Sequence, residues 1–399
     1  MKIAAHTLGC KLNFAETSDI LRRYEEQGNT IVDFHQVADL YIINTCTVTA
    51  VAEKKCRNAI RQAHRLNPEA QIVVMGCMAQ LQADQLKAMP GVSEVWGNDR
   101  KGLLQYSSGD RTRVFFKIQD GCDYFCTYCA IPYARGRSRS ATIEETLCAA
   151  HRIAREGARE VVLTGVNTGT FGQQHGERLI DLLRQLDQIE GIMRYRISSI
   201  EPNLLTDEII DFTASSRAFL PHFHIPLQAG TDHLLQLMRR RYDTALYRSK
   251  LERIKSVMPD ACIAADVIAG FNGESEEEFA QALDFIASLP ISYLHVFTYS
   301  DRPGTAALRL GEKVPIPVRH EHTQRLLELS EQKHHAFVSS QMGKSRPVLW
   351  EEGMKEGEKE KMYGWTDNYI RLARPYDSAL INTVESVAIT PNSIVNETN

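Results

Sequence analysis

Short apolar strands alternate with helical segments along most of this chain, and that recurrence restricts the fold more than any other feature of the sequence. In the first hundred residues, the expected strands are Lys2–Leu8, Leu40–Asn44 and Gln71–Met75, and helical spacing follows the first two over Glu16–Glu26 and Ala50–Leu66. Strands that alternate with helices build parallel sheets covered by helices. We therefore predict an α/β fold that begins with a Rossmann-like parallel domain over residues 1–110.

A second series of strands and helices begins near residue 113. The six expected strands are Val114–Ile118, Glu160–Thr164, Tyr195–Ser198, His222–Ile225, Ala264–Ala269 and His295–Tyr299. Six strand–helix units are too few to close an eight-stranded barrel, so we expect a partial (β/α)6 barrel over residues 111–341. Functional residues of such barrels gather at the carboxyl ends of the strands.

The pattern changes again after about Gly343, where short segments alternate like exposed strands. A small all-β barrel is therefore expected over residues 342–399, with a charged loop at Glu351–Lys361 and a polar tail from Pro391. Its expected strands are Arg346–Trp350, Asn368–Leu372 and Val384–Ile389.

Composition narrows the class of protein but does not identify a partner. The chain has 399 residues, of which 43% are hydrophobic, and no apolar run approaches the roughly 20 residues that cross a bilayer. The first residues lack the apolar stretch of a secretory signal, so we expect a cytoplasmic protein without a membrane partner. The net charge of −4 argues against a uniformly basic surface, although a local basic groove for nucleic acid remains compatible with it.

Three of the nine cysteines form a C-x3-C-x2-C motif, Cys122, Cys126 and Cys129, directly after the first barrel strand. In the cytosol, cysteines are expected to be thiols or metal ligands rather than disulfides. Thiolates suit iron–sulfur clusters, zinc or Cu(I), and a structural zinc site normally has four ligands. No fourth cysteine or histidine lies nearby in the sequence. We favour a catalytic cluster with one open iron, and a zinc loop completed by a distant residue is the alternative.

Three other cysteines, Cys10, Cys46 and Cys77, each follow one of the N-terminal strands. The carboxyl ends of parallel strands meet at one rim of a sheet, so these thiols should converge there and could hold a second cluster. Coincidence is the alternative, because cysteine is often simply buried. The remaining thiols that lie inside a helix or strand are interpreted as core residues: Cys56, Cys148 and Cys262.

The cysteine loop, with Tyr128 before its last cysteine, resembles the signature of the radical S-adenosylmethionine (SAM) superfamily. This resemblance implies a 4Fe–4S cluster whose open iron binds SAM. It also implies that one electron, from a donor such as flavodoxin or ferredoxin, cleaves SAM to a 5′-deoxyadenosyl radical. The residues implied as SAM contacts lie in this loop and at two strand ends: Tyr128, Gly165, Asn167, Ser199 and Glu201. Without the resemblance, a glycine at a strand end is usually a turn.

Motifs along nearly the whole chain resemble the methylthiotransferase family of radical SAM enzymes. Three of them surround Cys10, Cys46 and Cys77, over residues 7–13, 44–48 and 76–80, and residues 364–370 resemble the small RNA-binding TRAM module. Further matching segments are residues 133–140, 196–202, 225–232, 238–242 and 299–305. One residue departs from the pattern: Asn272 occupies a position where the family usually has proline. The replacement of proline by asparagine should loosen the turn at this position.

Membership implies a mechanism with two 4Fe–4S clusters and two SAM molecules. The N-terminal cluster would carry sulfur that one SAM methylates, and the radical from a second SAM would remove hydrogen from C2 of an adenosine in tRNA. The segment around Cys10, with Lys11 directly after the cysteine, resembles one branch of the family. That branch acts on N6-threonylcarbamoyladenosine next to the anticodon (position 37). Branches that act on isopentenyladenosine or on a ribosomal protein aspartate are alternatives, as is an RNA-binding protein with structural zinc. The sulfur source is not implied.

Basic and aromatic side chains are the expected contacts to tRNA. Arg135, Arg137 and Arg139 follow the cluster loop, whereas Arg239–Arg241 could equally be an exposed helix end favoured by the helix dipole. Trp365 and Tyr369 could stack on bases or belong to the core of the small barrel. If the C-terminal module contributes RNA affinity alone, a chain ending near Gln341 should still cleave SAM.

Overall fold

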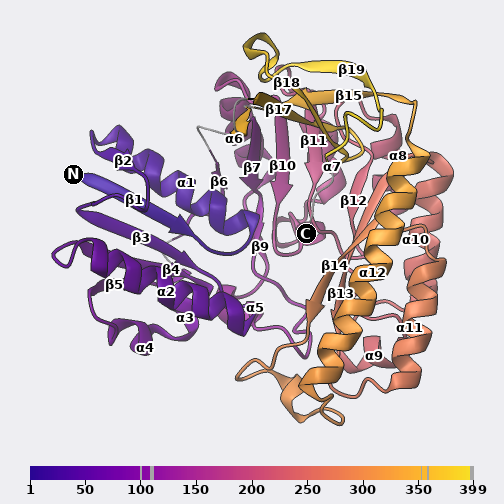
Figure 1. The fold of residues 1–399 in the computed structure, drawn as a ribbon, viewed down its shortest axis with the longest axis horizontal. Helices are drawn as coiled ribbons and strands as arrows, with labels where there is room; N and C mark the ends of the chain where they lie inside the picture. Colours follow the sequence, from indigo (N-terminus) through magenta and orange to yellow (C-terminus); the bar gives the residue numbers. More distant parts are fainter. Residues whose placement is uncertain (99–100, 108–111, 352, 357–358, 396–399) are drawn as a thin grey trace.

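The computed structural model describes residues 1–98, 101–107, 112–351, 353–356 and 359–395 (Figure 1). Its first unit is a five-stranded parallel sheet in the order β2-β1-β3-β4-β5. The strands are β1 (Lys2–Thr7), β2 (Thr30–Val32), β3 (Leu40–Thr45), β4 (Gln71–Gly76) and β5 (Val92–Trp96). The predicted parallel α/β unit is confirmed. Sequence reasoning missed only the edge strands β2 and β5, which are short and partly exposed.

Helices cover both faces of this sheet. Helix α1 (Lys11–Glu26) packs Ile20, Leu21 and Tyr24 against one face, and α2 (Ala50–Leu66) packs Ala59 and Ile60 against the other. The central strands β3 and β4 are buried on both faces, which explains why they are continuously apolar in sequence. Two short helices, α3 (Cys77–Leu81) and α4 (Ala83–Lys87), follow β4.

Six parallel strands form the expected partial barrel, in two groups. One sheet has the order β11-β10-β7-β6 and the other the order β12-β13-β14, and a bridge between Tyr195 and Phe219 connects the segments between them. Strand β6, which lies before residue 111, runs antiparallel to β7 and so extends the central sheet. The strands are β6 (Gln105–Tyr106), β7 (Arg113–Lys117), β10 (Glu160–Thr164), β11 (Arg194–Ile197), β12 (His222–His224), β13 (Cys262–Ala269) and β14 (Tyr293–Thr298).

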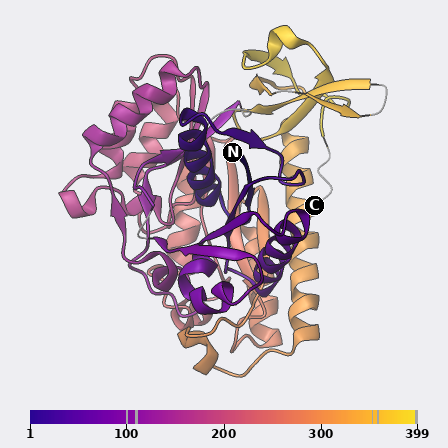
Figure 2. The ribbon, with the colours of Figure 1, turned by 90° about the vertical axis from the view of Figure 1, so that its left-hand side faces the viewer.

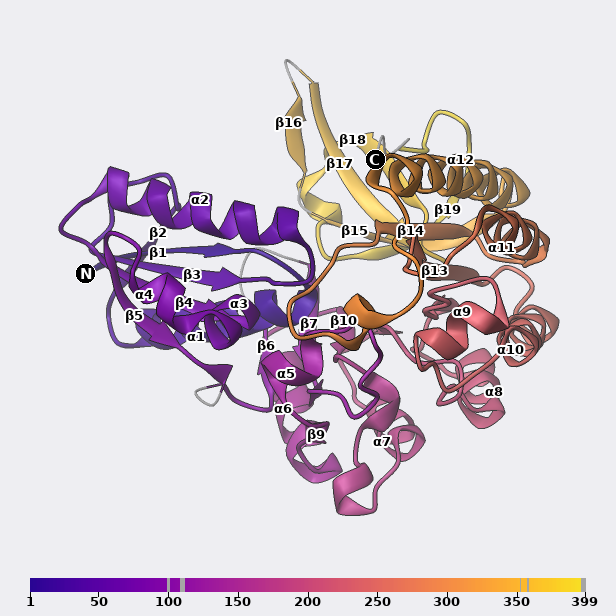
Figure 3. The ribbon, with the colours of Figure 1, turned by 90° about the horizontal axis from the view of Figure 1, so that it is seen from below.

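The barrel helices form an outer arc around these strands, on the side away from the N-terminal sheet (Figure 3). Capping boxes begin two of them, at Thr142 with Glu145 and at Ser275 with Glu278, as the sequence pattern Ser/Thr-x-x-Glu favours. The main helices are α6 (Ile143–Arg155), α7 (Leu179–Leu186), α8 (Asp207–Ser215), α10 (Thr244–Val257), α11 (Glu276–Ser288) and α12 (Ile316–Ser340), with short α5 (Ile131–Arg135) and α9 (Asp232–Leu237). No helix within the described residues is long and apolar enough to cross a membrane.

The C-terminal residues form an antiparallel sheet at one end of the barrel, directly after α12 (Figure 2). Part of the expected charged loop is instead strand. The expected strand Asn368–Leu372 is right only at its end: the chain turns at Tyr369, with φ +67°, and the strand runs from Arg371 to Pro375. The strands are β15 (Ser345–Trp350), β16 (Met354–Glu356), β17 (Lys359–Thr366), β18 (Arg371–Pro375) and β19 (Val384–Ala388). Residues 396–399 of the expected tail lie outside the described residues.

Candidate active site

The three N-terminal cysteines meet at the carboxyl edge of the first sheet. Cys10 precedes α1, Cys46 follows β3 directly, and Cys77 begins α3 after β4. Burial raises the pKa of Cys46 to about 11, and the nearby thiols of Cys77 and Cys10 act in the same direction. Gly76 makes the tight exit from β4 possible: its φ is +101°, and a Cβ there would lie 2.3 Å from the carbonyl oxygen of Thr45.

One buried arginine connects this cysteine group to the barrel. Arg135, at the end of α5, donates from Nε to the Cys77 sulfur at 3.3 Å and from Nη2 to Asn13 Oδ1 at 2.6 Å. Its Nη1 lies 2.9 Å from both Glu16 Oε1 and Asp120 Oδ1. A guanidinium that is 3% exposed and fully paired has no surface to offer a phosphate. This burial contradicts the prediction that Arg135 contacts RNA.

The same network holds an unequal number of positive and negative side chains. Lys117 and Lys101 also pair with Glu16, and Lys117 pairs with Asp120. Three buried cations therefore face two buried carboxylates, while the partly exposed Arg139 reaches Asp120 at 3.4 Å. Buried charges are costly unless balanced, so an anionic group is expected beside Cys77. A set of thiolates holding a metal cluster meets that requirement.

The second cysteine group occupies the loop between β8 (Gln119–Asp120) and α5. The Cys129 amide donates to the Cys126 carbonyl at 3.0 Å, which folds the loop into a tight turn. Gly121, at φ +69°, opens the loop; a Cβ there would lie 2.0 Å from the Arg137 carbonyl oxygen. Burial raises the pKa of Cys122 to about 11 and that of Cys129 to about 12, and the neighbouring Cys126 thiol adds to both shifts.

A second buried arginine supports this loop. Arg240 donates from Nη1 to the Cys126 sulfur at 3.0 Å and to the Tyr128 hydroxyl at 3.4 Å, and its Nη2 pairs with Glu201. Each cysteine group thus has one guanidinium against one of its sulfurs. The interpretation of Arg239–Arg241 as a plain helix end is wrong for Arg240, which lies in the site.

The five residues predicted to contact SAM lie around this loop or on the walls next to it. Gly165 and Ser199 line the larger cavity described below. A Cβ at Gly165 would lie 2.8 Å from the Gln119 amide oxygen, which also accepts from the Asn167 backbone N–H at 2.8 Å. Tyr128 and Glu201 share Arg240, as described above, and burial raises the pKa of Glu201.

Two adjoining cavities open between the cysteine groups. The smaller, of about 230 Å³, lies between Cys129 and the Thr47–Thr49 segment that follows Cys46. The larger, of about 610 Å³, runs from Cys10 and Lys11 into the barrel. Asp266 and Phe297 line both, so the two cysteine groups face one continuous region of the molecule.

The C-terminal module closes the far end of the larger cavity. Arg194 and Arg196 from β11 donate to the carbonyl oxygens of Trp365, Thr366 and Asp367 at 2.8–3.0 Å. Both guanidinium groups also pair with Glu160 on β10. The turn after β17 therefore packs against the amino-terminal end of the barrel strands and closes it. The C-terminal module thus contributes residues to the lining of the larger cavity.

This packing decides where the predicted RNA contacts lie. Trp365 is 9% exposed, and Tyr369 stacks on His222 with ring centroids 4.3 Å apart, so both rings line the larger cavity and not an open surface. Arg137 is exposed and pairs with Asp123, whereas Arg139 is only partly exposed. Arg137 and Arg139 remain the surface candidates.

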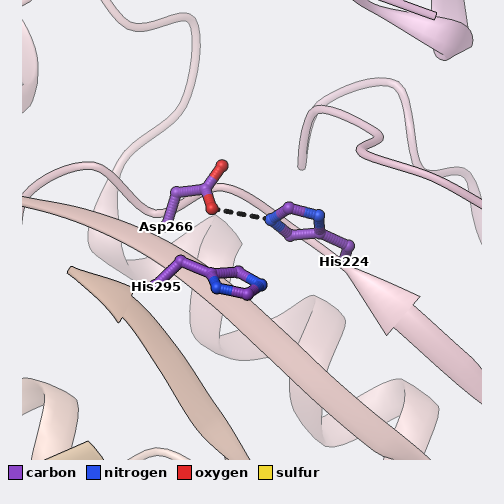
Figure 4. A group of neighbouring side chains, drawn as sticks. All are labelled: His224, Asp266 and His295. Atoms are coloured by element: carbon purple, nitrogen blue, oxygen red, sulfur yellow. Dashed lines mark hydrogen bonds and ion pairs between the residues drawn. The ribbon is translucent and has the colours of Figure 1, made fainter. Parts of the chain in front are cut away.

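Several side chains of the site were not predicted from the sequence. The most notable are His224 and Asp266, which form a hydrogen bond of 2.7 Å inside the larger cavity, with His295 beside them (Figure 4). Strand alternation could have placed all three inside the barrel, since each lies on a predicted strand.

Three expectations about individual residues need revision. Cys56 and Cys262 are buried as expected, but Cys148 is exposed on α6, and Cys56 is not isolated: its thiol donates to the Cys46 carbonyl at 3.6 Å. Asn272 does not loosen its turn. It is fully buried and donates to the Ala307 carbonyl at 2.9 Å, a bond that proline could not make.

Comparisons with known proteins agree with this architecture. Residues 2–97 match a family described as uncharacterized protein family UPF0004, and residues 116–286 match the radical SAM superfamily. Among solved structures, the radical S-adenosylmethionine methyltransferase TsrM from Kitasatospora setae covers 74% of each chain with a TM-score of 0.53 and 13% identity, which supports the fold alone.

Curated relatives align over almost the full length. A threonylcarbamoyladenosine tRNA methylthiotransferase MtaB from Bacillus subtilis is 39% identical over 97% of this chain and 93% of its own. The MtaB of Aquifex aeolicus is 36% identical over 94% and 97%. A tRNA-2-methylthio-N(6)-dimethylallyladenosine synthase from Desulfitobacterium hafniense is 30% identical over 97% and 94%. This chain therefore belongs to the radical SAM methylthiotransferase family.

Proposed function

We propose that this protein attaches a methylthio group to C2 of N6-threonylcarbamoyladenosine in tRNA, at the adenosine next to the anticodon. The observation that carries the proposal is the presence of two groups of three cysteines around adjoining cavities. A radical SAM enzyme with one cluster needs only one such group. Relatives named for this activity, at 36–39% identity over nearly the whole chain, support the choice of substrate.

The residues of both groups suit 4Fe–4S clusters, which proteins hold by cysteine thiolates. We propose Cys10, Cys46 and Cys77 as ligands of one and Cys122, Cys126 and Cys129 as ligands of the other. When bound, the clusters and SAM supply the transferred sulfur, its methyl group and the radical that removes hydrogen from C2. Arg135 and Arg240 donate to one sulfur of each group and favour the thiolate that iron needs.

The residues that line the two cavities are proposed to bind SAM and other polar ligands. Tyr128, Gly165, Asn167, Ser199 and Glu201 are proposed to bind SAM beside the Cys122–Cys129 loop. The hydroxyls of Thr164 and Ser198 are buried in the larger cavity without a partner among the described residues, so they are available to a polar ligand. The C-terminal turn keeps water out of the barrel base.

The larger cavity is proposed to take the modified adenosine. The exposed ring of Phe297 lines this cavity and offers a surface on which a base can stack. Cys10 lies at the entrance of the cavity. Arg137 and Arg139 would contact the tRNA backbone outside, and Trp365 and Tyr369 would meet the nucleoside inside. The remaining partner is an electron donor such as flavodoxin or ferredoxin, in the cytoplasm. Residues 1–110, 111–341 and 342–399 are proposed as domains.

One experiment tests the function directly. The protein is purified and reconstituted with iron and sulfide without oxygen, then given SAM, a reductant and tRNA that carries threonylcarbamoyladenosine. Nucleosides are analysed by mass spectrometry. We expect the methylthiolated nucleoside from the unaltered protein and from a Cys148→Ala control, whose thiol is exposed and outside both groups.

The triple variant Cys10→Ala, Cys46→Ala, Cys77→Ala separates the two cysteine groups. It should make 5′-deoxyadenosine but no methylthiolated nucleoside, and its iron content should fall by about half. Full product from this variant would make the three cysteines structural. If the unaltered protein modifies isopentenyladenosine and not threonylcarbamoyladenosine, it belongs to the other tRNA branch of the family.

A further inference from the structure

The larger cavity is lined by a lysine and by histidines as well as by aromatic rings. Lys11, an exposed residue at the start of α1, lines this cavity, and its Nζ lies 6.0 Å from the centroid of the Phe115 ring on β7. His222, His224 and His295 project from β12 and β14 into the same space. The mechanism proposed above assigns no task to any of these four side chains.

Two of these four side chains, Lys11 and His222, have no polar partner among the described residues. No carboxylate within the described part of the chain forms an ion pair with the Lys11 ammonium, and both ring nitrogens of the buried His222 lack a hydrogen-bond partner there. His295 is exposed to the cavity. Two carboxylates within the described ranges line the cavity: Glu331 on α12, and Asp266, which already accepts a hydrogen bond from His224 at 2.7 Å (Figure 4). A buried imidazole without a partner and an ammonium without an ion pair favour a polar ligand with negative charge.

The arrangement favours an anion over a metal ion. His224, Asp266 and His295 have ligand atoms within 4.8 Å of one another, which a divalent cation could use. Burial, however, lowers the pKa of both His222 and His295, and the Lys11 ammonium acts in the same direction, with a smaller effect than Arg196 at His222 and than His224 at His295. A positive charge beside these imidazoles opposes the binding of a metal cation and attracts a carboxylate. The two histidines are neutral at neutral pH and can each donate one N–H.

We propose that Lys11, together with His295, binds the carboxylate of the threonylcarbamoyl group and so selects this nucleoside over one with an apolar N6 substituent. The inference rests on the function proposed above and adds the residues that read the substrate. An isopentenyl group in the same place would leave the ammonium and the imidazole N–H without a partner, at the cost of their desolvation. The adenine would lie nearer the rim, toward Phe297 and Cys10.

The test compares two tRNAs that differ at one group. One carries threonylcarbamoyladenosine and the other carries the same nucleoside with its carboxylate blocked as the methyl ester. Methylthiolated product is measured at one fixed salt concentration to obtain kcat and KM for each tRNA. Because the ratio of acid to ester is taken within one preparation, differences in cluster loading cancel.

We expect the unaltered protein to prefer the acid by about 10- to 100-fold in kcat/KM, which is the usual size of a hydrogen-bonded charge, with the effect mainly in KM. Lys11→Gln should reduce that preference to less than about threefold, and Lys11→Glu should reverse it. Lys87→Gln, the same change on an exposed residue of α4, should keep the full preference. His295→Leu, on the barrel wall away from Cys10, should also reduce the preference if a Lys11 variant fails to fold.

The outcomes separate this inference from the proposed function. If the unaltered protein methylthiolates acid and ester equally well, or if both Lys11→Gln and His295→Leu keep its preference, the carboxylate is not bound here and the inference fails alone. If it methylthiolates neither tRNA, the proposed function fails and the inference falls with it. Binding of Zn²⁺ or Fe²⁺ that depends on His224 and His295, measured in the variant lacking the six cluster cysteines, would replace the anion site with a metal site.

Discussion

Replacing Arg135 by glutamine removes a side chain of the barrel that contacts the N-terminal cysteine group directly, at the sulfur of Cys77. Its guanidinium follows the Cys122–Cys129 loop by six residues and yet donates to the sulfur of Cys77 at 3.3 Å. The variant leaves Lys117 and Lys101 facing Glu16 and Asp120, so the buried charges become equal in number. Without a cluster, the protein should therefore lose less stability than the roughly 3–5 kcal/mol expected when a buried charge is left unpaired.

With a cluster bound at Cys77, the same change should cost more. Three thiolates on a 4Fe–4S core would carry net negative charge, and the Arg135 guanidinium contacts one of these sulfurs. A hydrogen bond to a charged group is worth about 1.5–3 kcal/mol, and two unit charges 4 Å apart interact by about 4 kcal/mol at an effective dielectric constant near 20. Affinity of the N-terminal group for its cluster should fall by about one to three orders of magnitude.

Iron retention and thermal stability measure this difference. Reconstituted Arg135→Gln protein, challenged with a chelator, should keep about four of about eight irons, and reconstitution should raise its melting temperature less than that of the unaltered protein. Arg135→Lys should restore the charge but not the fork of donors, and should recover part of the loss. The exposed Arg137→Gln is the matched control. If Arg135→Gln keeps all its iron and gains the same stability from reconstitution, the charge argument is refuted.

Three further predictions concern other parts of the molecule. Cys126→Ala should abolish 5′-deoxyadenosine formation while the N-terminal group still holds iron; SAM cleavage at the normal rate would contradict the ligand assignment. A chain ending at Gln341, which sequence reasoning expects to cleave SAM, should instead be unstable, because Arg194 and Arg196 lose the carbonyls of Trp365, Thr366 and Asp367 at about 1–3 kcal/mol for each unsatisfied group. A melting temperature unchanged from the full chain would disprove this. The cations Arg196, Arg194 and Arg113, which outweigh the opposing effect of burial, lower the pKa of Glu160 to about 2, so its contribution to stability should be complete above pH 4.5 and decline as the pH falls toward 2. The free energy of unfolding, measured with urea across that pH range, should depend less on pH in Glu160→Gln than in the unaltered protein. An equal pH dependence in the two proteins would contradict this role of Glu160.

Sequence reasoning located the strands because each is a short apolar run bounded by turn residues. All six barrel strands lie within about two residues of their predicted bounds. It also located the cysteine groups, since three thiols at parallel strand ends must share a rim. The segment around Tyr369 was misassigned because its alternation resembles a strand, whereas the Asp367–Asn368 pair before it makes a turn.

The partners of the buried arginines were beyond sequence reasoning. Arg135 and Glu16 are 119 residues apart and lie on two different helices, α5 and α1, and Arg240 reaches Cys126 over 114 residues. Local pattern gives each arginine a surface position by default, because arginine is rarely buried unless it is paired. Only the packing of the first sheet against the barrel shows that the pairs exist.

The contact between the C-terminal turn and the barrel strands has a consequence for how the chain is made. Arg196 leaves the ribosome 170 residues before Thr366, its carbonyl partner. At roughly 5–20 residues per second, the barrel strands wait about ten seconds or more, with two guanidinium groups and Glu160 open to water, before the last strands arrive. The barrel therefore completes its fold only near the end of synthesis. A stalled or prematurely terminated chain would expose an unfinished barrel to chaperones and proteases even though every cysteine of both groups had already been made.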